Sequence, residues 1–299
     1  MESLTSIDPQ TLAKIHGLRL RARHIVEGYV AGLHPSPYQG FSIEFAEHRE
    51  YAPGDDLRYL DWKVFGRSDK VYLKQFEDET NLICYLVLDI SESMTYVGPT
   101  AALSKLEYAQ SIAAALAWLV LRQQDAVGLA TFDNQIRAMV RPAGNPSHLE
   151  QLLSVMESAA PKQKTAAGPI FHELAQRLTK RGVVIVVSDF FDDLASLAAG
   201  LTHFRHRKHD VMLLHVLDAA ELDFPFRGLT DFVGLEQFPG VPADPQVIRS
   251  AYLRELSHFR QALERECRRQ AIDYFLVRTD QPLDVVLSHV LATRQRSLR

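Results

Sequence analysis

From about residue 81 onward, hydrophobic residues occur in short uninterrupted runs, separated by longer segments with helical spacing. Runs of this kind are typical of parallel strands that are covered on both faces. We expect five such strands: LICYLVLD (82–89), AVGLATF (126–132), VVIVVSD (183–189), DVMLLHVLD (210–218) and AIDYFLVRT (271–279). A shorter run, IRAMV (136–140), follows the second strand closely enough to be its hairpin partner at a sheet edge. The pattern predicts an α/β fold with a doubly wound, mostly parallel sheet of the Rossmann type.

Three of the intervening segments have clear helical patterns. The segment from about 101 to 122 has little polar face, so we expect a nearly buried helix. The segment from about 247 to 270 is amphipathic and is expected to lie on the surface. A final helix is predicted after Asp280, with Pro282 in its first turn.

The first eighty residues do not follow this alternation. They hold one helical segment (about 8–32) and then a stretch rich in turns, charges and aromatic residues. We therefore predict an N-terminal helix-plus-β layer over residues 1–80 and a main domain over 81–299. Within that domain, residues 219–245 contain FPFRGLTDFVGL, which predicts an insertion with a short hairpin.

The amino-acid composition limits the classes of function that the chain can have. The 299 residues are 46% hydrophobic, enough for a sizeable core, and carry a net charge of -4. Since there is no excess of positive charge, nucleic acid is a poor candidate ligand. The longest apolar stretch is too short to span a bilayer, and the first residues lack the features of a signal peptide, so we expect a cytoplasmic protein without a membrane span. The two cysteines, Cys84 and Cys267, are expected to be buried thiols.

Candidate chemistry begins in YLVLDISESM (85–94), where a buried strand ends in Asp89 and is followed by Ser91 and Ser93. Ligands of open parallel sheets bind at the carboxyl ends of strands. Carboxylate and hydroxyl oxygens suit Mg²⁺ or another hard divalent ion. Taken alone, however, this motif is more often a cap or a turn. A second strand also ends in an aspartate, Asp189, and Thr165 lies in the polar segment between the two.

This set resembles the metal-ion-dependent adhesion site of von Willebrand factor A domains, in residue types and in their order along the chain. The resemblance implies a site for Mg²⁺ (or Mn²⁺ or Ca²⁺) formed by Asp89, Ser91, Ser93, Thr165 and Asp189. In such domains an acidic side chain of a partner protein fills the open coordination position. The chain departs from the family at Lys164 and Phe190, where glycine is favoured. Glu92, Asp192 and Asp193 could rim the site or compete for the ion.

The segment EFAEHREYAPGDDLRYLDWKVFGRSDKVYLKQFEDE (44–79) is the most unusual part of the sequence. Its Arg49, Tyr51, Pro53-Gly54-Asp55-Asp56 and Asp61-Trp62 elements resemble the bacterial domain-of-unknown-function 58 family. That resemblance implies a von Willebrand factor A-like domain and a role as an adaptor that works with a MoxR-type AAA+ ATPase in protein or complex maturation. From the residues themselves, we favour a charged network that packs around Trp62 over a second metal site.

Two alternatives to a metal-dependent protein-binding module stay open. A metal-dependent phosphohydrolase of the haloacid-dehalogenase kind generally needs a second aspartate two positions after the first, where this chain has Ser91. Enzymatic activity is therefore disfavoured, and we predict no catalytic residues. A scaffold whose site binds no metal is the other alternative. Among the histidines, we interpret His203, His206 and His209 as a polar helix face and His215 as a core residue.

Overall fold

The computed structural model describes residues 8–32, 48–50, 72–74, 82–160, 167–233 and 240–297. The chain forms two compact units, one of Met1–Pro35 with Leu82–Arg299 and the other of Ser36–Asn81. In the smaller unit, β1 (His48–Glu50) pairs antiparallel with β2 (Tyr72–Lys74). The rest of the charged and aromatic signature, Trp62 included, lies outside the described residues, so its predicted packing stays a prediction.

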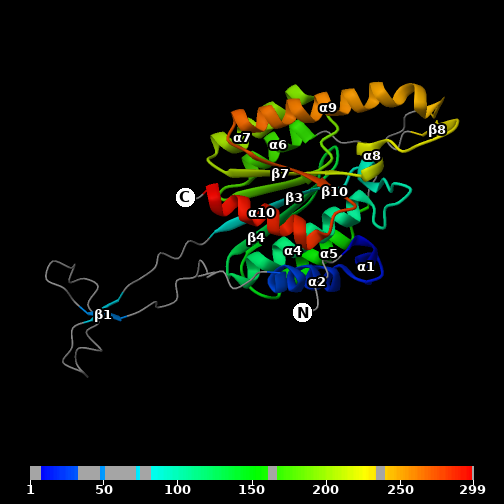
Figure 1. Ribbon diagram of the computed structural model, residues 1–299. Coiled ribbons are helices and arrows are strands. Elements are labelled where there is room, and N and C mark those ends of the chain that lie inside the picture. Colours follow the sequence, from blue (N-terminus) through cyan, green and yellow to red (C-terminus); the bar gives the residue numbers. More distant parts are fainter. Residues whose placement is uncertain are drawn as a thin grey trace. The chain divides into compact units, whose positions relative to one another are not determined.

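The larger unit is built on a six-stranded sheet, in which only β5 is antiparallel to its neighbour (Figure 1). The spatial order is β10-β7-β6-β3-β4-β5. In chain order the strands are β3 (Ile83–Asp89), β4 (Ala126–Phe132), β5 (Ile136–Ala143), β6 (Val183–Ser188), β7 (Asp210–Leu217) and β10 (Asp273–Arg278). This arrangement confirms the predicted doubly wound α/β fold, including the edge hairpin of β4 and β5.

Helices cover both faces of this sheet. On β3, Leu86 and Leu88 belong to one apolar core and Val87 to the other. The first core is completed by α1 (Pro9–Ala13), α2 (Leu18–Gly32), α4 (Lys105–Arg122), α5 (His148–Glu157) and α10 (Leu283–Ser297). The second is completed by α6 (Ala167–Arg177), α7 (Leu194–His206) and α9 (Pro245–Arg269). Burial on both faces explains why the strands are continuously apolar.

The helix α4 is apolar almost all round because it is covered on both sides. Its Ala113 and Ala117 are fully buried, and α2 packs against it as part of the same unit. The N-terminal helical segment therefore groups with the sheet, whereas residues 36–81 form the separate unit. The helix begins with a capping box, in which Ser104 and Glu107 bond each other's backbone N–H groups at 2.9 and 3.1 Å.

The predicted insertion follows β7. It contains α8 (Ala219–Asp223) and an antiparallel pair of short strands, β8 (Thr230–Phe232) and β9 (Val241–Ala243), so the predicted hairpin is present. Cys84 and Cys267 are both buried free thiols, as expected. In the described parts of the chain, no helix has the length and apolar character needed to cross a membrane.

Candidate functional site at the carboxyl edge of the sheet

The strand order reverses beside β3. From β3 the chain moves to β4 on one side, and after β5 it returns to β6 on the other side of β3. Leu88 of β3 is paired with Val187 of β6, so Asp89 and Asp189 follow at neighbouring strand ends. In open α/β sheets this reversal creates the crevice in which ligands bind. The two aspartates predicted from sequence therefore lie at the expected position for a site.

The turn after β3 is organised by the Asp89 carboxylate. Its Oδ1 accepts a hydrogen bond from the Ser91 backbone N–H at 2.9 Å, and its Oδ2 accepts one from the Ser188 hydroxyl at 2.5 Å. The chain then enters a 3₁₀ turn, η2 (Glu92–Thr95), which places the Ser91 and Ser93 hydroxyls 3.0 Å apart. Asp89 and Ser91 are fully buried. The two serine hydroxyls thus form an oxygen pair next to a buried carboxylate.

The position of Asp89 disfavours the charged form of its side chain. Burial, followed by repulsion from Asp189, raises the pKa of Asp89 to about 7. The hydrogen bonds from Ser188 and Ser91 act in the opposite direction but do not compensate. The ionised form of Asp89 is therefore costly unless additional positive charge is supplied at this edge of the sheet.

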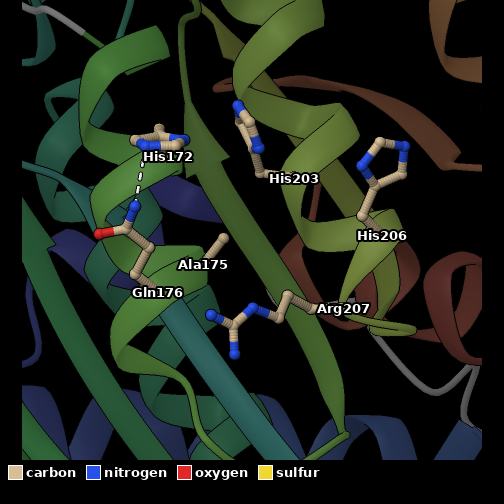
Figure 2. A pocket seen from close by; sticks show the side chains of 6 residues that line it. All are labelled: His172, Ala175, Gln176, His203, His206 and Arg207. Atoms are coloured by element: carbon tan, nitrogen blue, oxygen red, sulfur yellow. Dashed lines mark hydrogen bonds between the residues drawn. The ribbon is translucent and has the colours of Figure 1, made fainter.

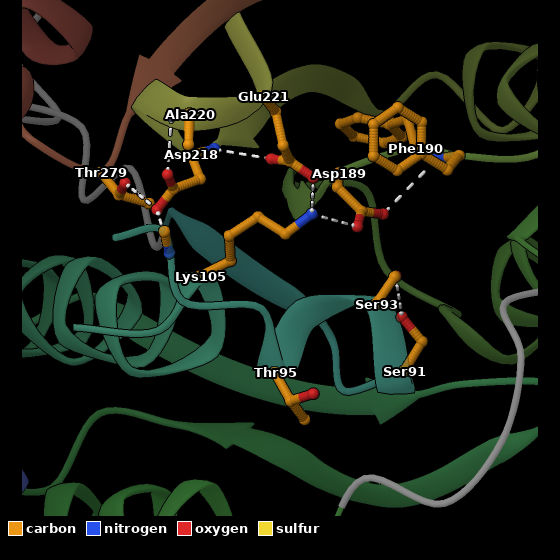
Figure 3. A network of polar contacts seen from close by, with 12 residues as sticks. Ser91, Ser93, Thr95, Lys105, Asp189, Phe190, Asp218, Ala220, Glu221 and Thr279 are labelled. Atoms are coloured by element: carbon orange, nitrogen blue, oxygen red, sulfur yellow. Dashed lines mark hydrogen bonds and ion pairs between the residues drawn. The ribbon is translucent and has the colours of Figure 1, made fainter. Parts of the chain in front are cut away.

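A buried lysine pairs with the second aspartate, Asp189. The Lys105 ammonium, at the start of α4, lies 2.8 Å from Asp189 Oδ2 and 2.8 Å from Glu221 Oε1 of α8 (Figure 3). Its side chain is 1% exposed. Burial alone would lower the pKa of Lys105, but the Asp189 and Glu221 carboxylates raise it above its usual value, so the residue is charged. Its Nζ also lies 5.1 Å from the centre of the Phe191 ring.

A third strand-end aspartate, Asp218 after β7, ties the surrounding loops together. Its carboxylate accepts bonds from the Thr279 hydroxyl at 2.9 Å, the Gly98 N–H at 3.3 Å and the Ala220 N–H at 2.8 Å. Glu221 in turn accepts a bond from the Asp218 backbone N–H, which completes the capping box of α8. The loops after β3, β7 and β10 are thereby fixed to one another beside the ion pair of Lys105 (Figure 3).

Of the predicted metal ligands, the structure brings together Asp89, Ser91, Ser93 and Asp189. The fifth, Thr165, lies outside the described residues, and its role stays a prediction. Two of the nearby acidic residues, Asp192 and Asp193, have other partners. Asp193 caps α7 by accepting a bond from the Ser196 N–H at 2.8 Å, and Asp192 accepts one from the Gly168 N–H at 3.4 Å.

The residues that are present suit a hard divalent ion. At this edge the Asp189 and Glu221 carboxylates share the ammonium of Lys105, and the buried carboxylates of Asp89 and Asp218 add further negative charge when they are ionised. In addition, Glu92 Oε2, between the two serines in sequence, is buried without a hydrogen-bond partner. In the described residues, no three His, Cys, Asp or Glu side chains converge as a metal site. Beside Asp89, the Ser91 and Ser93 hydroxyls offer two further oxygen atoms of the kind that hard divalent ions bind.

The sequence reasoning missed Ser188 and three charged residues of this site, Lys105, Asp218 and Glu221. Asp218 had a visible signal, because it ends an apolar strand just as Asp89 does. Lys105 had a weaker one, as a cation at the start of a helix expected to be buried. No local pattern indicated that Lys105 and Asp218 lie at the same edge of the sheet as Asp189.

A separate pocket of about 240 Å³ lies on the outer side of α6 and α7 (Figure 2). Its lining residues are His172, Ala175, Gln176, His203, His206 and Arg207. The rings of His172 and His203 are 4.1 Å apart, with an edge-to-face orientation. The expectation of a shared polar face holds for His203 and His206 but is wrong for His209, which lies beyond the end of α7 and is buried. His215 is a core residue, with its Nδ1 2.7 Å from the Tyr274 hydroxyl.

Residues 47–266 match the family described as "Protein of unknown function DUF58". The chain belongs to this family. An uncharacterized protein of Mycobacterium tuberculosis (strain H37Rv) is 24% identical over 301 residues, which cover 97% of this chain and 91% of the relative. The uncharacterized protein YeaD of Bacillus subtilis is 26% identical over 185 residues, 60% of this chain and 42% of YeaD. The family predicted from the signature of residues 44–79 is confirmed.

Solved structures with some likeness include the conserved hypothetical protein BatB from Bacteroides thetaiotaomicron, with 16% identity and a TM-score of 0.49. The alignment covers 72% of this chain and 99% of BatB. An aerotolerance-related membrane protein from Bacteroides fragilis has 19% identity and a TM-score of 0.43, over 71% of this chain and 97% of that protein.

Proposed function

We propose that this chain is a metal-dependent protein-binding module and has no enzymatic activity of its own. One observation carries the proposal. The buried aspartates Asp89 and Asp189 lie where the strand order of the sheet reverses, with the Ser91 and Ser93 hydroxyls 3.0 Å apart beside them. Asp89 and the serines would hold Mg²⁺, Mn²⁺ or Ca²⁺, with Asp189 binding directly or through water. Thr165 remains the predicted fifth ligand.

The charge of the site supports this role. A divalent ion offsets negative charge that Lys105 leaves uncompensated at this edge, and it favours the ionised form of Asp89, whose pKa is otherwise raised by burial. When bound, the ion supplies a position that accepts a carboxylate oxygen from a partner protein. Ser188 keeps Asp89 oriented through the bond between its hydroxyl and Asp89 Oδ2.

Exposed apolar side chains near this edge support a protein partner. Val97 follows η2 and is 51% exposed, and Phe191 follows Asp189 and is 37% exposed. The insertion after β7 and the start of α9 add Leu229, Val233, Val241 and Val247, which are 58% to 84% exposed. Contiguous exposed apolar side chains mark protein interaction sites, so we propose that these side chains contact the partner. We call these six side chains the apolar rim.

The insertion is connected to the site by aromatic packing. Phe224, at the end of α8, packs on Tyr252 of α9 at 4.6 Å between ring centres and stacks on Phe232 of β8 at 5.7 Å. Tyr252 is close enough to the Glu221 and Lys105 charges for both to affect its pKa. A partner that places a carboxylate at the metal could therefore also contact the hairpin.

For the partner, we propose a MoxR-type AAA+ ATPase, with this chain as an adaptor in protein or complex maturation. This assignment rests on the family resemblance of the N-terminal signature. Against a phosphohydrolase, the position two residues after Asp89 is Ser91, whose backbone N–H donates to Asp89 and whose hydroxyl lies at the Ser93 hydroxyl. The chain thus lacks a carboxylic acid at the position where that chemistry needs one.

Surface-immobilised ATPase and purified full-length chain test the proposal, with binding measured in Mg²⁺ and in EDTA. We expect binding by the wild type in Mg²⁺ alone, loss of binding by Ser91→Ala/Ser93→Ala, and weaker binding by Leu229→Ser. Leu20→Ser is the matched control, because Leu20 is a 49% exposed leucine on α2. Equal binding in Mg²⁺ and EDTA would contradict metal dependence. Equal losses for Leu229→Ser and Leu20→Ser would remove the hairpin from the interface.

A further inference from the structure

Lys105 occupies an unusual position for a lysine. Its side chain is 1% exposed, and its ammonium is within 2.8 Å of two carboxylates from different segments, Asp189 after β6 and Glu221 in α8. The Phe191 and Tyr96 rings lie 5.1 and 5.9 Å from Nζ. A buried ammonium persists only where carboxylates or aromatic faces replace its hydration, and Lys105 has both.

One of its two carboxylate partners is also a predicted metal ligand. Asp189 Oδ2 faces the ammonium, while Asp189 Oδ1 is 3.4 Å from the Phe191 N–H. A divalent ion and an ammonium repel each other, so both cannot approach the same carboxylate without a loss of binding energy. Glu221 is different, because it belongs to the α8 cap and is not among the predicted ligands.

We propose that Lys105 competes internally with the metal ion for Asp189, and that Glu221 retains the ammonium when the ion takes Asp189. The proposal rests on the metal site of the proposed function, and it assigns to that site a built-in control of affinity. In the absence of a divalent ion, Lys105 neutralises Asp189 and keeps the loops after β3, β6 and β7 together. Metal binding shifts the lysine's pairing toward Glu221.

This competition connects the metal site to the insertion. Glu221 holds the start of α8 through its bond to the Asp218 backbone N–H, and Leu229, Val233 and Val241 of the apolar rim follow α8 in the insertion. A change in the pairing of Lys105 therefore alters the contacts of α8, which precedes the β8–β9 segment that we propose contacts the partner. Metal occupancy and the position of the hairpin become coupled through one side chain.

Calorimetric titration of Mn²⁺ into the full-length chain tests the competition. Four proteins are compared: wild type, Lys105→Met, Glu221→Gln and the double variant. Lys105→Met should bind Mn²⁺ about tenfold more tightly, and Glu221→Gln about threefold more weakly, the size typical of couplings between residues in contact. Since Glu221 acts through Lys105, the Glu221→Gln effect should vanish in the Lys105→Met background. Lys180→Met, at an exposed lysine, controls for net charge.

The possible results separate the competition from the proposed function. Equal Mn²⁺ affinities in wild type, Lys105→Met and Glu221→Gln would overturn the competition and leave the metal site intact. An equal Glu221→Gln effect with and without Lys105 would also overturn it, because Glu221 would then act by its own charge. Binding by Lys105→Met but not by wild type would support the competition and contradict the proposed function. If Lys105→Met does not fold, an unchanged affinity in Glu221→Gln overturns the competition.

Discussion

Replacing Asp89 by asparagine should make the protein's stability less dependent on pH. An asparagine side chain can still accept a bond from the Ser91 N–H through its oxygen and can donate one to the Ser188 hydroxyl, so it imitates a neutral Asp89. It removes the charge that burial disfavours. The substitution thus isolates the free energy of ionising this carboxylic acid in the folded protein.

The size of the effect follows from the pKa of Asp89. Burial and Asp189 raise it to about 7 in the folded state, against about 3.9 in an unfolded chain. Because the folded state binds this proton more tightly, the associated stability is fully present below about pH 4 and is lost as the pH rises through about 7. Between about pH 5 and pH 8, the wild type should lose about 3 kcal/mol relative to Asp89→Asn.

Urea unfolding of both proteins, in EDTA and across this pH range, measures that difference. The free energy of unfolding of Asp89→Asn should rise steadily relative to wild type as the pH increases. Added Mg²⁺ should then stabilise the wild type more at about pH 8 than at about pH 5, and should leave Asp89→Asn almost unchanged. Parallel pH profiles for the two proteins would refute the reasoning, because Asp89 would then be ionised without cost.

Three further substitutions or treatments test other parts of the structure. Asp218→Ala should lower the free energy of unfolding by about 3 kcal/mol, because a helix cap and the bond from the Thr279 hydroxyl are lost; a urea-derived loss below about 1 kcal/mol would count against this. Gly200→Ala places a new Cβ 2.6 Å from the Gly168 carbonyl oxygen where α6 and α7 meet, so calorimetry should show a destabilisation of about 2 kcal/mol. Burial raises the pKa of Cys267 to about 12, so a thiol reagent should modify it only after unfolding.

The strands could be predicted well because their pattern has a single physical cause. The run 126–132 coincides with β4, and the predicted pairing of 136–140 with it is present in the sheet. The spatial order of the strands in the sheet could not be predicted from such patterns. The position of β3 between β6 and β4, and the packing of α2 on α4, depend on contacts between distant segments, for which no local periodicity exists.

The site was predictable to the extent that it is built from strand ends. Asp89 and Asp189 were recognisable because each ends an apolar run. The partner of Asp189 was not, because Lys105 is 84 positions away in sequence and is brought to it by the folding of α4 against the sheet. Sequence motifs therefore predicted the carboxylates Asp89 and Asp189, but not Lys105, the cation that neutralises part of their negative charge.

The central claim is that the edge of the sheet with Asp89, Ser91 and Ser93 binds a divalent ion. Thermal unfolding of the wild type and of Ser91→Ala/Ser93→Ala, in increasing Mg²⁺ or Mn²⁺ and in EDTA, tests it most directly. A ligand that binds only the folded state raises the unfolding temperature in proportion to the logarithm of its concentration. We predict this rise for the wild type and its loss in the double variant. An equal response of both proteins, or no response of the wild type at any concentration, would contradict the claim.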